Sequence, residues 1–157
     1  MKSYQVPEPG MPLQEVDSPT PKPTGKEVLV KTIACGVCHS DVHIHSGAFD
    51  LGGGNKLNVP VPNPFTLGHE VFGEVVAVGP DAANVSIGDK RIVYPWIGCS
   101  NCDVCEKGDE HLCNIGPVIG VTMPGGFGDH VVVPDSKYLH DAGAVSYTHL
   151  TLPTKLA

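Results

Sequence analysis

Four cysteines lie close together in the chain at a spacing that suits one metal ion. They are Cys99, Cys102, Cys105 and Cys113. Four thiolates bind Zn²⁺ in a closed tetrahedron with no place for a substrate, so the pattern predicts a structural zinc site. Because segment 98–114 has few apolar side chains, metal binding must supply its folding energy. Disulfides, an iron–sulfur cluster and unliganded thiols are the alternatives.

A second group of metal-binding and proton-transferring residue types occurs earlier, in two short motifs. They are Cys35-Gly36-Val37-Cys38-His39-Ser40-Asp41-Val42-His43 and Gly68-His69-Glu70. A thiol near a helix N-terminus has a lowered pKa and binds metal better, and His69 is a candidate second ligand. Ser40 and His43 are three residues apart, so on a helical turn they can hydrogen-bond in series. Taken alone, the motifs also fit a structural histidine, a redox pair or two buried thiols.

Short β-strands must position these residues. Runs rich in β-branched side chains predict strands over 27–34, 71–78, 90–94 and 130–133. Residues 7–23 are rich in proline and predicted to be extended. One or two helical turns are expected within 36–46, and the glycines and prolines of 52–64 predict a surface loop. Strands every 10–20 residues with turns between them favour a mainly β fold, a partly open β-barrel with short helices.

The composition excludes several classes of protein. The 157 residues suffice for one domain, or for one domain and a part of another. The net charge is −7 and the ten Lys and Arg residues form no run, so we expect no nucleic-acid partner. No apolar stretch is long enough for a transmembrane helix, and the N-terminus carries no secretory signal. We therefore expect a cytoplasmic protein with reduced cysteines and no membrane partner.

In this order and spacing, the motifs resemble those of the zinc-dependent medium-chain alcohol dehydrogenases. The resemblance covers residues 1–144, including the stretch from Gly73 to Gly79 and Gly88-Asp89-Lys90. It implies a GroES-like catalytic domain over 1–144 with a structural zinc lobe at 98–114. It also implies one structural and one catalytic Zn²⁺, NAD or NADP as cofactor, a small-molecule alcohol or aldehyde as partner, and a homo-oligomer.

The resemblance also implies the ligands of the catalytic zinc. Cys38 and His69 would bind this ion, with Glu70 beside it. The zinc would act as a Lewis acid that lowers the pKa of the alcohol. Cys35 matches no catalytic position, and we expect it to be a buried small hydrophobe.

Four further residues receive roles from the resemblance. Ser40 would take the proton of the alcohol, and His43 would pass it outward to solvent. His39 would contact the cofactor pyrophosphate, at a position where the family carries Arg or His. Trp96 would line the substrate pocket.

Two parts of the family pattern are missing from the sequence. No G-x-G-x-x-G occurs with a βαβ pattern, so the Rossmann domain of the family is absent from this chain. The third ligand of the catalytic zinc, a cysteine in this family, is also absent, because no cysteine follows Cys113. We do not expect His130, His140 or His149 to replace it.

The last residues, 145–157, read as foreign to the domain. The stretch from Val145 to Thr154 can be encoded by a DNA string that resembles the transposon-end adapter of sequencing libraries. We therefore interpret 145–157 as a non-native, adapter-derived tail, and expect the true gene to run on past about Ala144. The fragment should keep its structural zinc, hold the catalytic zinc poorly and show no turnover.

The expected function belongs to the intact gene product. It would oxidise primary or secondary alcohols to aldehydes or ketones, with hydride transfer to NAD(P). One alternative is a stand-alone zinc-binding β-barrel module without catalysis, similar to co-chaperonin barrels. Another is a polyol, threonine or formaldehyde dehydrogenase, or a cinnamyl-type reductase, of the same fold.

Overall fold

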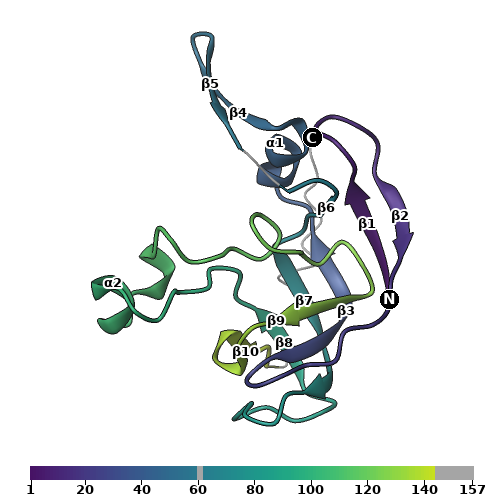
Figure 1. The fold of residues 1–157 in the computed structure, drawn as a ribbon, viewed down its shortest axis with the longest axis vertical. Coiled ribbons are helices and arrows are strands. Elements are labelled where there is room, and N and C mark those ends of the chain that lie inside the picture. The colour runs from purple at the N-terminus through teal and green to yellow at the C-terminus, as the bar shows by residue number, and fades with distance from the viewer. Residues whose placement is uncertain (60–61, 144–157) are drawn as a thin grey trace.

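The chain folds around one five-stranded antiparallel sheet (Figure 1). The computed structural model describes residues 1–59 and 62–143. The strand order is β10-β8-β7-β3-β9. The bounds are Leu139–Asp141 for β10, Lys90–Val93 for β8, Glu70–Val78 for β7, Val28–Gly36 for β3 and His130–Val133 for β9. The four strands predicted from β-branched runs are thus confirmed.

Strands β3 and β7 form the long central pair of this sheet. They are paired antiparallel from Val28 opposite Val78 to Gly36 opposite Glu70, with two register shifts. The strands approach closely at Gly73, where a Cβ atom would lie 2.4 Å from the carbonyl oxygen of Lys31. Buried valines from β3, β7, β8 and β9 form the larger core cluster beside the sheet. The central sheet is therefore a stable base for the loops at its ends.

A smaller sheet closes against the first and gives the partly open barrel that was expected. It contains β2 (Gln14–Asp17), β1 (Lys2–Val6) and β6 (Phe65–Thr66), in that order. Segment 125–129 joins the two sheets by backbone hydrogen bonds. The Tyr4 N–H donates to the Phe127 carbonyl at 2.8 Å, and the Thr32 N–H donates to the Asp129 carbonyl at 2.9 Å.

Helix α1 (His39–Ser46) lies against this junction. Its one buried apolar side chain, Ile44, packs in a second core cluster with Val6, Phe65 and Leu67. The helix ends at Gly47, whose φ of 81° is a left-handed conformation that favours glycine. The N-terminus of α1, which carries the Cys38 motif, is thereby fixed against the barrel.

The predicted surface loop after α1 is wrong in part, because it contains a β-hairpin. Strands β4 (Ala48–Gly52) and β5 (Asn55–Asn58) pair antiparallel and project from the body of the molecule (Figure 1). The three glycines at 52–54 all have positive φ, so they form the turn of the hairpin rather than a longer loop. The strands are short and exposed, which explains why no hydrophobic alternation marked them.

The cysteine-rich segment forms a separate projection, with α2 at its tip (Figure 1). It contains α2 (Asp103–Glu106) and the 3₁₀ turn η1 (Glu110–Leu112), while a second 3₁₀ turn, η2 (Ser136–Tyr138), precedes β10. All strand pairs in the described residues are antiparallel, so these residues contain no βαβ unit. No helix within 1–59 or 62–143 has the length and apolar character needed to span a membrane.

Candidate functional site

The four cysteines of the lobe converge on one point. Their sulfur atoms all lie within 4.8 Å of one another. The Sγ atoms of Cys99 and Cys105 are 3.8 Å apart, and those of Cys102 and Cys113 are 3.9 Å apart. Four sulfurs at about 2.3 Å from a central zinc would be separated by about 3.8 Å in a tetrahedron. A disulfide needs about 2.05 Å between its sulfurs, so the geometry suits zinc.

Backbone amides of the lobe favour the thiolate form that a metal needs. The N–H groups of Cys99 and Ile115 lower the pKa of Cys113 to about 6. The amide of Cys105 likewise lowers the pKa of Cys102. Burial instead raises the pKa of the Cys105 thiol to about 12. A bound cation would compensate the cost of that buried charge, so the donor set fits a zinc ion.

The second group of ligands lies where α1 and β7 begin. Cys38 is the N-cap residue of α1, and His69 and Glu70 stand at the start of β7. One ligand atom from each of the three lies within 4.8 Å of the other two. The amide of Ser40 lowers the pKa of Cys38. The structure therefore brings together the three side chains that the resemblance assigned to a catalytic metal, from two different elements.

Asp41 holds this group together, and the sequence reasoning gave it no role. Its side chain is only 3% exposed. Its Oδ2 accepts from the Cys38 N–H at 2.9 Å, and its Oδ1 accepts from the Gly68 N–H at 3.2 Å. Oδ1 also lies 3.3 Å from the buried Nδ1 of His69, at ion-pair distance rather than in ordinary hydrogen-bond geometry. The carboxylate raises the pKa of His69 to about 9 and leaves Nε2 for a metal.

A cavity of about 440 Å³ opens beside this group. The lining side chains are Cys38, Ser40, His69, Glu70, Ile92, Val93, Tyr94, Pro95 and Trp96. Trp96, which was expected here, is 45% exposed and its ring centroid lies 5.5 Å from that of Tyr94. Tyr94 was not singled out from the sequence, although its place between a predicted strand and Trp96 was a usable signal. One wall of the cavity is thus apolar and aromatic.

The predicted proton-transfer residues lie along one side of α1. Ser40 Oγ is 3.6 Å from Cys38 Sγ. The His43 ring is stacked on His39, with centroids 4.5 Å apart, and contacts Phe49 of β4 at 4.7 Å. In the described residues no hydrogen bond joins Ser40 to His43, so the serial link between them stays a prediction. His39 is exposed at the outer end of this stack.

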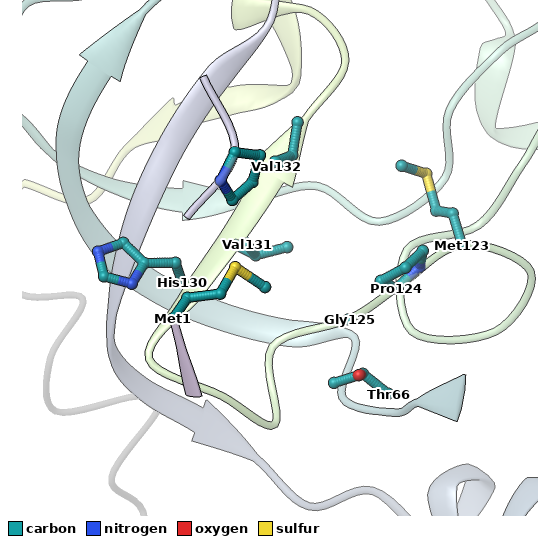
Figure 2. A pocket seen from close by; sticks show the side chains of 9 residues that line it. Met1, Thr66, Met123, Pro124, Gly125, His130, Val131 and Val132 are labelled. Atoms are coloured by element: carbon teal, nitrogen blue, oxygen red, sulfur yellow. The ribbon is translucent and has the colours of Figure 1, made fainter. Parts of the chain in front are cut away.

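The remaining candidates are not among the three ligands, although Cys35 lies next to Glu70. Burial raises the pKa of Cys35 to about 12, and its sulfur fills the space beside Gly68 and Gly126. His130 is paired with Asp129 at 2.8 Å and lines a different cavity, of about 170 Å³, between Met1 and Met123 (Figure 2). The His140 ring meets Tyr94 edge-on. His149 and the tail 145–157 lie outside the described residues.

Comparison with known proteins decides the family. A family model described as "Alcohol dehydrogenase GroES-like domain" matches residues 24–143. The chain belongs to this family. An NAD-dependent alcohol dehydrogenase of Sulfurisphaera tokodaii is 42% identical over 147 residues, covering 89% of this chain and 40% of that protein. The fold is therefore the GroES-like domain of the alcohol dehydrogenase family, as the motifs implied.

Other relatives of this GroES-like domain carry different names. An L-threonine 3-dehydrogenase of Pyrococcus furiosus is 38% identical over 128 residues, which cover 82% of this chain and 34% of that protein. A cobalt- and zinc-bound thermostable alcohol dehydrogenase from Pyrobaculum aerophilum superposes with a TM-score of 0.81 at 30% identity, over 98% of this chain and 44% of that one. The chain thus spans about two fifths of the length of the relatives that it matches.

Proposed function

We propose that this chain is the catalytic-domain part of a zinc-dependent dehydrogenase that oxidises primary or secondary alcohols to aldehydes or ketones. The domain would comprise residues 1–144, with the structural zinc lobe at 98–114, within a longer protein that uses NAD or NADP. One observation carries the proposal: Cys38, His69 and Glu70 meet at the cavity that Ser40 and Trp96 also line.

Two zinc ions would have different tasks. The four lobe thiolates would enclose the first completely, so this ion would stabilise the lobe and touch no substrate. Cys38 and His69 would hold the second, with Glu70 at its edge and a side open to the cavity. A zinc ion held there would supply a Lewis acid that lowers the pKa of an alcohol, and a bound nicotinamide would supply the hydride acceptor.

The side chains around the second ion would orient the substrate and move its proton. Ser40 lines the cavity next to Cys38, where its hydroxyl can accept the proton of the alcohol. His43 lies one helical turn further on and would carry the proton toward the exposed His39 and solvent. His39 would also meet the pyrophosphate of the cofactor. Asp41 fixes the ring of His69 and the start of α1 throughout.

The cavity favours an alcohol with an apolar substituent. Ile92, Tyr94, Pro95 and Trp96 give it an apolar wall, and none of its described lining residues is Lys or Arg. An amino-acid substrate such as threonine carries a carboxylate, for which the described lining residues offer no Lys or Arg partner. The apolar wall therefore favours alcohol oxidation over threonine oxidation for this chain.

The decisive experiment uses the gene beyond codon 144. The proposal requires a cysteine codon soon after this point and a glycine-rich βαβ unit further on. The encoded protein should oxidise benzyl alcohol faster than threonine, and Cys38→Ala should abolish turnover. Cys35→Ala is the matched control and should retain it, because Cys35 lies outside both groups of ligands. A native stop codon at this point, or an encoded protein that oxidises no alcohol, would favour a zinc-binding module without catalysis. Full activity of Cys38→Ala would contradict the role of Cys38 as a ligand of the catalytic metal.

A further inference from the structure

Trp96 belongs to a five-residue segment, Tyr94–Gly98, that connects β8 to the lobe and forms one wall of the cavity. We call it the wall segment. It is paired with the segment that leaves the lobe. The Ile97 N–H donates to the Pro117 carbonyl at 3.0 Å, and the Ile119 N–H donates to the Pro95 carbonyl at 2.9 Å. Trp96 lies opposite Val118 in this pairing.

Both ends of the wall segment are held by one residue, Tyr138 of η2. Its backbone carbonyl accepts from the Tyr94 N–H at 2.8 Å. Its side-chain hydroxyl accepts from the Gly98 N–H at 2.9 Å, in a buried hydrogen bond. The Tyr138 ring is 4% exposed and belongs to the larger core cluster, so both oxygen atoms sit on a rigid base.

Gly98, where the wall segment enters the lobe, is closely packed and has little room to move. A Cβ atom at Gly98 would lie 2.8 Å from the Cβ and Cγ atoms of Glu110, so Glu110 covers Gly98 directly. Glu110 accepts from Lys137 Nζ at 2.5 Å, next to Tyr138 in the chain. The hydroxyl of Tyr138 therefore meets the wall segment at the point where the lobe begins.

We propose that Tyr138 is a positioning residue for the substrate wall: its carbonyl and hydroxyl oxygens clamp the two ends of Tyr94–Gly98 and so set the place of Trp96. The inference rests on the proposed function only in taking the cavity beside Trp96 as the substrate site. A substitution at Tyr138 would then change the preference for alcohols of different size through Trp96. It would leave the metal ligands and the proton-transfer residues in place.

Tyr138→Phe tests this in the zinc-loaded 157-residue chain, because it removes the hydroxyl and keeps both the ring and the backbone carbonyl. Trp96 is the chain's single tryptophan, so its fluorescence reports on the wall alone. We expect a red-shifted emission, stronger acrylamide quenching, and exchange of the Gly98 amide faster by about five-fold, the equivalent of one ordinary hydrogen bond. The Ile97 amide is the internal control and should change less.

Two control variants separate positioning from general stability. Val133→Ala creates a cavity in the same core cluster and should lower the melting temperature without moving the Trp96 emission. Glu110→Gln keeps the Tyr138 hydroxyl and a polar side chain beside it, so it should also leave the emission in place. Unchanged Trp96 emission and quenching in Tyr138→Phe would overturn the proposal, as would a Glu110→Gln variant that reproduces the full shift.

The same variant in the longer, active protein links the wall to specificity. KM for benzyl alcohol should rise about five-fold while kcat for ethanol stays close to that of the parent protein. Equal losses for both alcohols would overturn a role in substrate size. If that protein oxidises no alcohol, the proposed function fails, whereas the fluorescence result in the shorter chain still decides whether Tyr138 clamps the wall.

Discussion

The two proposed metal centres of this domain are built in opposite ways. The lobe takes all four ligands from one loop of fifteen residues, and neither core cluster includes a described residue between 98 and 116. The second centre takes Cys38 and His69 from two elements, and the buried Asp41 links them. We therefore expect the lobe to obtain its order from a bound metal, and the second centre to obtain its order from the barrel.

The largest effect should come from breaking the lobe. Cys102→Ser removes one of four thiolates, and metal binding contributes on the order of 10 kcal/mol to folding of such a site. We expect loss of about one zinc per chain and proteolytic cleavage within 98–116, measured by elemental analysis and mass spectrometry. Cys35→Ser should keep the zinc. A metal-free Cys102→Ser lobe that still resists protease would contradict the contrast between the centres.

A smaller effect should follow from weakening the frame of the second centre. Asp41→Asn removes the charge beside His69, and loss of such a partner typically lowers metal affinity by about 10–100-fold. Zinc titration of the longer protein against a chelator should show this loss at the second centre alone, with the lobe still filled. Asp50→Asn, on the exposed hairpin, is the control. Equal loss of zinc affinity at both centres would mean that Asp41 does not act on the second centre specifically.

The contact between the hairpin and the second centre should be weaker still. Phe49→Ala removes one of two aromatic neighbours of His43, the other being His39, and such ring pairs contribute about 0.5–1.5 kcal/mol. The His43 ring proton resonances should lose their ring-current shift in NMR spectra. Leu51→Ala, at an exposed position of the same strand, should leave these resonances in place. Unchanged His43 resonances in Phe49→Ala would mean that the hairpin does not order the proton path.

The smallest effect concerns the joint between lobe and barrel. Lys137 lowers the pKa of Glu110. The ion pair therefore stabilises the fold fully at pH values above the usual pKa of a glutamate. This stabilisation is lost as the pH falls through the lowered pKa of Glu110. The two side chains are 43% and 21% exposed, so Glu110→Gln should cost at most about 1 kcal/mol at pH 7. The unfolding free energies of the two proteins should converge once the pH falls below that lowered pKa. A difference independent of pH would point to lost packing instead of lost charge.

Local patterns explain what could be predicted from the sequence. The lobe cysteines are close in the chain, and the β-branched runs of β3 and β7 mark strands whatever their partners. Asp41 was missed because a carboxylate in the first turn of a helix is common and its partner Gly68 is distant in the chain. Tyr138 was missed for the same reason, since its hydroxyl meets Gly98 forty residues away. The hairpin lacked alternation because both its strands are largely exposed.

Strand β9 has a consequence for how the isolated chain behaves in solution. Within the described residues it pairs with β3 along one side, and its other side leaves the amides and carbonyls of His-Val-Val-Val without a strand partner. Such an edge is a template for strand addition and self-association at high protein concentration. Val132, which is partly exposed, is the position where a lysine would block this addition.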